Sequence, residues 1–370
     1  MEVVERPMGN GNNRPYSKAL PHLSPHEPCQ GPDPDPHLVG PLELRRECAD
    51  VLRGRPALLR RDFVSVSEEK SPHQPFRVMQ WNSLAQALGE GMDSFTRCPP
   101  EALNWPERKY MILEEILTYQ PDILCLQEVD HYFDTFQPLL VPLGYQGSFC
   151  PKPWSLCLNV ANNNGPDGCV LFFRCDRFQL RGISHLQLSA MGLKTNQVAI
   201  VATLCCRATG QVFCIAVTHL KARSGWKDLR TAQGDDLLCK LQSISRKAAI
   251  STTGSDTCVP ILVCGDFNAE PSEVIYHLFA TSTLGLDSAY KHLSPDGQTE
   301  PAYTTWKIRS SGESCHTLDY VWYSRDHFSV RAVLDFPTAE QIGPNRLPSY
   351  SYPSDHLSLV CDFSFSHLPE

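Results

Sequence analysis

Short runs of hydrophobic residues, each long enough for one buried strand, recur along the chain from residue 76 onward. A helix is predicted from Pro106 to the residue before Pro121, because proline favours the first turn of a helix and cannot continue one. Its buried face would carry Tyr110, Leu113, Ile116 and Leu117, and further helices are expected over residues 228–247 and 272–280. The predicted strands cover residues 76–81, 123–128, 146–150, 168–174, 198–205, 212–219, 260–265, 318–323 and 357–363. Strands and helices mixed over about 295 residues predict one large α/β domain.

The chain before residue 76 has a different character. Residues 1–41 are rich in proline, glycine, asparagine and histidine, and we expect disorder there because little of the segment could be buried. Residues 42–63 carry a short helical pattern that Gly54 and Pro56 interrupt, and residues 68–75 have the composition of a linker. We therefore expect a disordered segment (1–41), a short helical segment with a linker (42–75) and the main domain (76–370).

The overall composition is that of a globular protein, with 42% hydrophobic and 20% charged residues and no apolar run as long as a membrane span. The first ten residues include Glu2 and Glu5 and lack an apolar stretch, which argues against a signal or transit peptide. The 16 cysteines lie mostly inside apolar runs and form no CxxC pair, so buried free thiols are expected. We therefore expect a cytoplasmic protein, with mitochondrial or nuclear pools left open.

The formal net charge is −8. A protein that tracks a long nucleic-acid backbone usually carries an excess of lysine and arginine along one stripe. The acidic balance instead permits a small phosphorylated substrate or a short oligonucleotide held locally.

Several of the predicted strands end or begin at a polar residue that could bind a metal or transfer a proton. Taken singly, a strand-end aspartate is usually a cap or turn residue, and a lone histidine is usually structural. Together they predict a site for a hard metal ion next to an acid–base pair. The residues are Asn82, Glu128, His219, Asp266 with Asn268, Asp319, and Asp355 with His356.

The segments around these residues read WN, QE, THL, GDFN, LDY and SDH, and they resemble the motifs of the exonuclease–endonuclease–phosphatase superfamily. The resemblance covers about residues 76–370 and implies the DNase I-like fold. That fold is a four-layer αββα sandwich in which two mixed β-sheets are flanked by helices and the site lies at one edge. Longer stretches, among them RVMQWNSLAQALGEG and YTTWKIRSSGE, resemble one branch of the superfamily that is related to mRNA deadenylases.

Phosphoester hydrolysis needs a metal to polarise phosphate oxygens, a base to deliver water and donors for the developing charge. Glu128 would supply a charged oxygen ligand and Asn82 a neutral one, which suits one or two Mg²⁺ ions. Asp266 would orient or deprotonate the attacking water. Asn268, through its amide donor, would bind the transition-state oxygens.

His356 and its neighbours complete the expected catalytic set. Asp319 would hold His356 in one tautomer and favour its protonated form, making it either a phosphate-facing donor or the general base. Asp355 is interpreted as a strand cap that orients nearby groups, with a second-metal ligand as the alternative.

The segment THLKAR predicts a cradle for phosphate. His219, Lys221 and Arg223 are spaced by two, so an extended backbone would point all three to one side. Arg223 could bind an oxyanion through two hydrogen bonds. Three further residues are candidate substrate contacts: Lys152 and Arg309 on expected loops, and Asn196 near a strand edge.

The resemblance to the branch implies removal of the 2′-phosphate of NADP⁺ and NADPH. Its deadenylase relatives imply the alternative, a poly(A)-specific 3′-exoribonuclease acting on mRNA. The acidic balance and the concentrated cations favour a monoester on a small ligand. An inactive RNA- or protein-binding scaffold is a third interpretation, disfavoured because every motif residue is present. Other hydrolase motifs, namely GxSxG, Walker A and HExxH, do not occur in the sequence.

Overall fold

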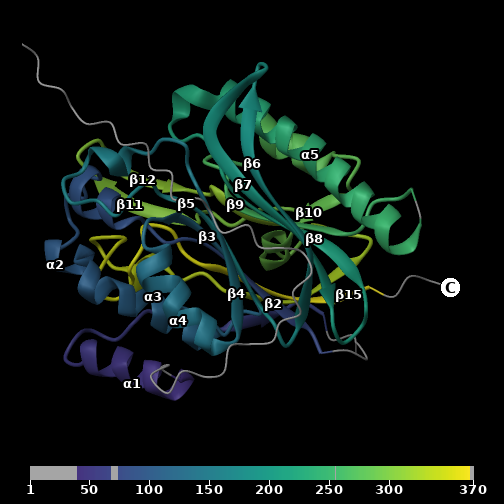
Figure 1. The fold of residues 1–370 in the computed structure, drawn as a ribbon. Coiled ribbons are helices and arrows are strands. Elements are labelled where there is room, and N and C mark those ends of the chain that lie inside the picture. The colour runs from purple at the N-terminus through teal and green to yellow at the C-terminus, as the bar shows by residue number, and fades with distance from the viewer. Residues whose placement is uncertain (1–39, 68–73, 255, 367–370) are drawn as a thin grey trace, which may run out of the picture. The chain divides into compact units, whose positions relative to one another are not determined.

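The centre of the computed structural model is a pair of stacked β-sheets, seen in Figure 1 with helices on both outer faces. The structure describes residues 40–67, 74–254 and 256–366. The expected disorder of residues 1–41 falls, apart from Gly40 and Pro41, outside these ranges, as does most of the expected linker. None of the helices in the described ranges combines the length and apolarity that crossing a bilayer requires.

The first sheet has the strand order β1-β14-β15-β2-β3-β5-β4. Its only parallel pair in the described chain is β2–β3, and the other neighbours are antiparallel. The strands are β1 (Phe63–Ser65), β2 (Phe76–Asn82), β3 (Ile123–Val129), β4 (Tyr145–Pro151), β5 (Gly168–Arg174), β14 (Phe328–Leu334) and β15 (Leu359–Phe365).

The second sheet has the strand order β10-β13-β9-β8-β7-β6. It repeats the pattern of the first sheet, because one parallel pair, β8–β9, lies among antiparallel neighbours. The strands are β6 (Phe178–Ala190), β7 (Leu193–Cys206), β8 (Val212–His219), β9 (Ile261–Asp266), β10 (Leu286–Ser288) and β13 (Asp319–Ser324). A separate hairpin is formed by β11 (Thr305–Arg309) and β12 (Gly312–His316).

Helices cover the outer face of each sheet. α3 (Trp105–Tyr119) packs on the first sheet through Ile112 and Ile116, and α1 (Pro41–Val51) packs on the far side of α3. α5 (Lys227–Thr253) and α6 (Val274–Ala280) pack on the second sheet. The remaining α-helices are short: α2 (Pro100–Leu103), α4 (Gln137–Leu140) and α7 (Ala339–Ile342). The predicted four-layer αββα arrangement is confirmed.

The central core is the layer of side chains between the two sheets. Alternate residues of the inner strands face this layer, such as Cys125 of β3, Val217 of β8 and Cys264 of β9. The cysteines in the described residues are free thiols and most are buried, as the sequence predicts.

Every strand expected from an apolar run is present, whereas β1, β6, β10, β11, β12 and β14 were not predicted. β6 lies at the edge of its sheet and exposes alternate residues such as Arg181, Ile183 and His185. A half-exposed strand interrupted by polar residues has no continuous apolar run, which explains why the pattern missed it.

The segment before residue 76 contributes directly to the fold. β1 pairs with β14, and Arg61 is buried with its guanidinium 2.9 Å from the carboxylate of Glu115 on α3. Arg61 also donates to the carbonyl oxygen of Ser358 at 2.9 Å. Arg61 therefore anchors the chain at Ser358, two residues after His356.

We expect Arg61→Ala to lower the free energy of unfolding by about 3–5 kcal/mol, because it leaves the buried Glu115 carboxylate without its charge partner. Urea unfolding of the full chain measures this loss. The control is Arg53→Ala, which removes an exposed ion pair with Asp50 and should cost no more than about 1 kcal/mol. Equal, small losses in both variants would contradict the anchoring role of Arg61.

Candidate active site

The polar strand ends come together where the two parallel strand pairs finish at the same edge of the sandwich. In the second sheet, Asp266 on β9 is in register with His219 on β8 and with Asp319 on β13. In the first sheet, Asn82 ends β2 next to the end of β3, which carries Glu128. Carboxyl ends of parallel strands meet at one edge, and the amino end of the antiparallel strand β13 lies at the same edge, so the fold places all these groups together.

Asn82 connects the two sheets. Its Nδ2 donates to Glu128 Oε1 at 2.9 Å and to Asp266 Oδ2 at 3.0 Å, and its Oδ1 accepts from the Leu84 backbone N–H at 3.1 Å. The amide nitrogen, rather than the expected ligand oxygen, therefore faces the two carboxylates. Burial and the negative charge of Asp355 raise the pKa of Glu128.

Asp266 and Asn268 occupy the turn that follows β9. The backbone N–H of Asn268 donates to Asp266 Oδ1 at 2.9 Å, and Asn268 has a left-handed φ of 51°. The side-chain Nδ2 of Asn268 donates to Leu220 O at 3.1 Å and lies 3.0 Å from His219 Nε2. Both amide hydrogens are thus directed at protein groups, so Asn268 orders His219 here instead of pointing a free donor at substrate.

His219 is buried beside this turn. Because its Nε2 accepts from Asn268, we assign the ring proton to Nδ1, a buried atom without a hydrogen-bond partner among the described residues. Burial and the nearby Lys152 lower the pKa of His219 to about 4, which makes the ring neutral at pH 7. His219 therefore offers one N–H donor that no described protein group uses.

Asp319 and His356 form the expected pair. Asp319 Oδ2 lies 2.8 Å from His356 Nδ1 and accepts a second hydrogen bond from the Thr304 hydroxyl at 2.6 Å. Burial alone would lower the pKa of His356, but the negative charges of Asp319, Asp266 and Asp355 together raise it to about 9. His356 is therefore protonated at neutral pH, with Nε2 3.8 Å from Asp266 Oδ2.

Asp355 is not a strand cap, because β15 begins only at Leu359 and the Asp355 carboxylate is buried in an ion pair with Lys307. Arg309 lies 3.4 Å from the same carboxylate and 3.0 Å from Asp93. Burial alone would raise the pKa of Asp355, but the positive charges of Lys307, His356 and Arg309 together hold it well below its usual range. Arg309 belongs to strand β11, so its expected position on a loop was wrong.

The remaining candidate cations divide into paired and unpaired groups. Lys152 follows β4 and donates to the buried Asp167 carboxylate at 2.6 Å. Lys221 and Arg223, in contrast, have no carboxylate partner among the described residues. Burial is the main cause that lowers the pKa of Lys221, and the positive charges of Arg223 and Lys152 lower it further. Two free cations thus lie next to the His219 and Asn268 turn.

The predicted geometry of the THLKAR segment needs correction. β8 ends at His219, and Arg223 has a φ of 80°, so the three side chains do not share one side of an extended strand. Lys221 and Arg223 lie in the loop between β8 and α5. Asn196 is exposed on β7, on the same strand face as the core residue Val198.

Sequence reasoning missed several buried residues that hold the site together. Arg108 on α3 donates to Leu84 O at 2.8 Å, to Ser83 O at 3.0 Å and to Pro353 O at 3.2 Å. It therefore connects the loop after Asn82 to the loop before Asp355. Lys307 could have been found, because it lies two residues before Arg309 and shares its strand face.

The donor set fits a hard divalent cation. Carboxylate oxygens of Glu128 and Asp266 lie within 4.8 Å of each other. Two carboxylates in this arrangement suit a cation such as Mg²⁺, which prefers oxygen ligands and retains water.

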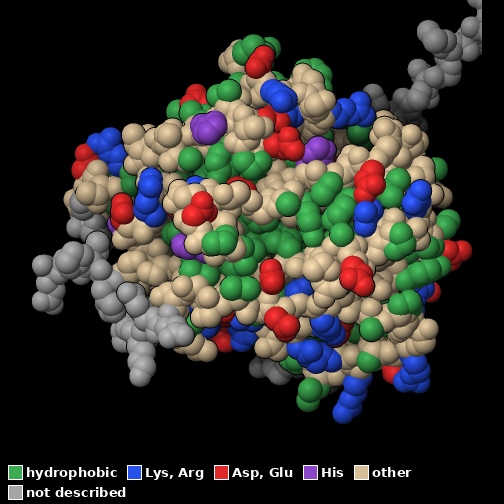
Figure 2. All heavy atoms as spheres, turned by 180° about the vertical axis from the view of Figure 1, so that it is seen from behind, with side chains coloured by type: hydrophobic (Ala, Val, Ile, Leu, Met, Phe, Trp, Pro, Cys, Tyr) green, Lys and Arg blue, Asp and Glu red, His purple; other side chains and the backbone are tan. Residues whose placement is uncertain are grey.

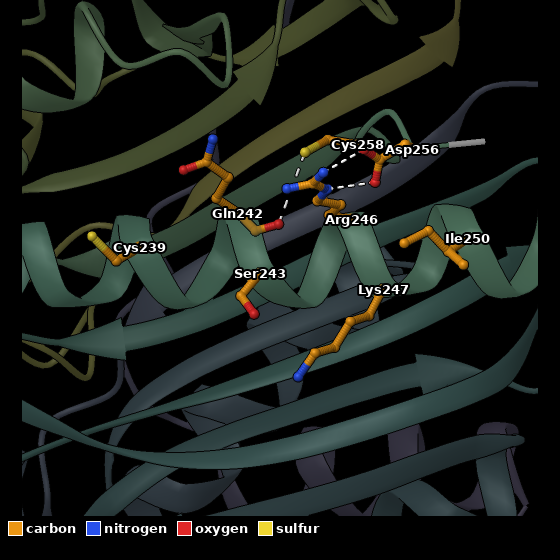
Figure 3. Close-up of a pocket in the computed structure, with 8 residues that line it drawn as sticks. All are labelled: Cys239, Gln242, Ser243, Arg246, Lys247, Ile250, Asp256 and Cys258. Atoms are coloured by element: carbon orange, nitrogen blue, oxygen red, sulfur yellow. Dashed lines mark hydrogen bonds and ion pairs between the residues drawn. The ribbon is translucent and has the colours of Figure 1, made fainter. Parts of the chain in front are cut away.

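A hollow on the outer side of α5, with a volume of about 490 Å³, has no such donor set (Figure 3). Its Arg246 is already paired with Asp256.

Comparison with known proteins agrees with this geometry. Residues 79–356 match the model of the Endonuclease/Exonuclease/phosphatase family, and the chain belongs to that family. Within it the chain is similar to nocturnin: it is 61% identical to the Rattus norvegicus protein over 373 residues, which cover 98% of this chain and 85% of the relative. The predicted branch of the superfamily is thereby confirmed as that of nocturnin.

A more distant relative is the CCR4-Not complex 3'-5'-exoribonuclease subunit Ccr4 of Yarrowia lipolytica, 29% identical over 343 residues. That match covers 78% of this chain and 48% of the relative. These likenesses support a function of the phosphoesterase or deadenylase type.

Two solved structures share the fold. The human Nocturnin catalytic domain with bound sulfate anion has 58% identity and a TM-score of 0.70, covering 85% of this chain and all of that chain. ANGEL2, a 2′,3′-cyclic phosphatase solved with adenosine-2′,3′-vanadate, has 25% identity and a TM-score of 0.68, covering 83% of this chain and 99% of that one. The predicted DNase I-like fold is confirmed.

Replacing the main carboxylate of the cluster tests whether it binds a metal. We expect Glu128→Ala to reduce phosphoester hydrolysis at least about a hundredfold, because metal stabilisation of phosphate charge is worth several kcal/mol. EDTA should match this loss, and added Mg²⁺ should reverse the effect of EDTA. Glu313→Ala, which removes an exposed partner of Arg346, is the control. Full turnover in Glu128→Ala or in EDTA would refute the metal site.

Asp319 and His356 should act as one unit, because they share a buried hydrogen bond. We expect the double variant Asp319→Ala/His356→Ala to be scarcely slower than either single variant. The kcat values of the four proteins measure this coupling. Losses that multiply would show that the two residues act separately.

Proposed function

We propose that this chain is a Mg²⁺-dependent phosphoester hydrolase that removes the 2′-phosphate of NADP⁺ and NADPH, giving NAD⁺ and NADH. The observation that carries the proposal is that Lys221 and Arg223, two and four residues after His219, have no carboxylate partner within the described ranges. Lys152 and Arg309 are already neutralised by buried carboxylates, so they add less free charge to a ligand.

Two adjacent free cations suit a terminal phosphate. A phosphate monoester carries nearly two negative charges at neutral pH, whereas each diester of poly(A) carries one. A compact dianion therefore gains more from the Lys221 and Arg223 pair than a polymer backbone does. The sulfate anion in the structure of the human relative is consistent with an anion-binding site in this branch.

The site residues can be given roles in this reaction. Glu128, held in place by Asn82, would bind Mg²⁺, which when bound polarises a phosphate oxygen and offsets its charge. Asp266, fixed by Asn82 and by the Asn268 N–H, would accept a proton from the attacking water. His219 Nδ1–H would donate to a phosphate oxygen.

Of the two roles expected from sequence, hydrogen-bond donor and general base, His356 takes that of the donor. Its raised pKa keeps it protonated at neutral pH, so it cannot accept the proton of water there. As the bond between phosphorus and the ribose 2′-oxygen breaks, His356 Nε2–H would stabilise the oxygen that leaves. That oxygen would take the Nε2 proton of His356 and become the ribose hydroxyl, and the proton that Asp266 took from water would restore His356, whose Nε2 lies 3.8 Å from Asp266 Oδ2.

The alternative substrate is poly(A), which the likeness to Ccr4 favours. A deadenylase would distribute its contacts over several nucleotides and stack bases on aromatic rings. On the face drawn in Figure 2, lysine and arginine side chains are interspersed with acidic ones and do not form a continuous band. This face therefore offers no basic track for a polymer, and the formal net charge of −8 also favours the small ligand.

Side-by-side assays separate the two substrates. We expect the full chain with Mg²⁺ to release phosphate from NADPH, to release none from NADH and to leave a poly(A) oligonucleotide uncut. Efficient shortening of poly(A) without phosphate release from NADPH would make the exonuclease the correct assignment.

Lys221→Ala and Arg223→Ala should each slow NADPH turnover by roughly ten- to a hundredfold. Each removes a hydrogen bond to a charged group, worth about 1.5–3 kcal/mol. Lys247→Ala, which changes an exposed lysine of α5, is the matched control and should have no effect. Wild-type kcat/KM in both cation variants would contradict their role in binding the phosphate.

A further inference from the structure

The loop that carries the two free cations is held in an unusual backbone conformation. Arg223 has a φ of 80°, a region that residues other than glycine seldom adopt. Its carbonyl oxygen accepts from the Trp226 N–H at 3.2 Å, and the Lys221 Nζ lies 5.5 Å from the centre of the Trp226 ring. Such a conformation persists only where neighbouring groups enforce it.

The enforcing group is Arg230 on the first turn of α5. Its Nη1 donates to the carbonyl oxygen of Arg223 at 2.6 Å and to that of Lys221 at 3.1 Å. Its Nε and Nη2 donate to the Glu273 carboxylate, the shortest of these bonds being 2.7 Å. A guanidinium has five N–H donors in a fixed fork, and this arrangement occupies all of them.

Glu273 belongs to the loop that follows Asp266 and Asn268. Its backbone N–H donates to Glu270 O at 2.9 Å, and its side chain is as well buried as that of Arg230, with exposures of 7% and 1%. The ion pair therefore joins the loop with the free cations to the loop with the hydrolytic aspartate. Gln233, one turn further along α5, adds a bond from the Lys221 N–H at 3.2 Å.

We propose that Arg230 and Glu273 form a positioning pair that sets where Lys221 and Arg223 present their charges relative to Asp266. The pair does not touch the substrate, and it acts through the two backbone carbonyls that Arg230 holds. The proposal rests on the proposed function, and it assigns phosphate affinity to a buried ion pair outside the predicted site. Displacing the two cations by about 1 Å would weaken phosphate binding without removing any cation.

Two variants of the full chain test the pair. Arg230→Lys keeps a positive charge beside Glu273 but lacks the fork that reaches both carbonyl oxygens. Arg230→Met/Glu273→Met replaces the ion pair with apolar side chains of similar size, an exchange that often leaves stability unchanged. Using both variants separates lost positioning from a buried charge left without a partner.

We expect both variants to raise the KM for NADPH by roughly ten- to a hundredfold while kcat changes only a few-fold. They should weaken competitive inhibition by inorganic phosphate by the same factor. In the background Lys221→Ala/Arg223→Ala, Arg230→Lys should have no further effect, because the charges that it positions are gone. Arg246→Lys, on the same helix but paired with the exposed Asp256, is the matched control and should leave both constants unchanged.

An unchanged KM for NADPH in folded variants would overturn the proposal. So would an equal rise in KM when Arg230→Lys is introduced into the Lys221→Ala/Arg223→Ala background. Calorimetric binding of inorganic phosphate distinguishes this failure from failure of the proposed function. Phosphate binding that Arg230→Lys weakens, in a protein that does not hydrolyse NADPH, would support the positioning pair and reject the substrate. Phosphate binding that Arg230→Lys leaves intact would reject the positioning pair alone, and no binding by the wild type would reject both.

Discussion

The site depends on one amide group. Asn82 Nδ2 donates to Glu128 of the first sheet and to Asp266 of the second, which brings two carboxylates close together at the edge of the sandwich. Like charges this close repel, and burial in the site, followed by the negative charge of Asp355, already raises the pKa of Glu128. A donor shared between them lowers the cost of this repulsion and fixes their separation. The other site residues are arranged around this pair: His219 ends β8, whereas Asp319 begins β13 and His356 lies just before β15.

The cations of the site have two distinct tasks. Lys307 and Lys152 are buried with Asp355 and Asp167, so their charges are balanced within the protein. These pairs hold the loops in place, and they leave little charge to attract a ligand. Lys221 and Arg223 keep their charges free but need their loop to be held by backbone contacts instead. The proposed binding of a dianion would use both kinds of cation, since free charges without a rigid frame would lose the geometry of the phosphate.

The sequence predicted the strand-end residues because their signal is local. Glu128, Asp266 and His219 each follow an apolar run, and the fold brings the ends of such runs together whatever the details of the loops. Arg230 and Arg108 could not be predicted in this way. Each lies inside a helix and acts on backbone atoms of a distant segment, as when Arg108 reaches Pro353. Their roles depend on tertiary contacts, which no spacing rule along the chain reports.

Three of the candidate site residues have a strained backbone. Glu128, Asn268 and Arg223 all have positive φ values, of 54°, 51° and 80°, although none is glycine. Each such conformation costs about 1–3 kcal/mol, so the surrounding structure must supply that energy. Asn82 bonds the side chain of Glu128, Asp266 bonds the backbone of Asn268, and Arg230 bonds the backbone of Arg223. Because this cost is met when the chain folds, the charged groups are in position before any ligand binds, and little reorganisation would be left for the proposed reaction.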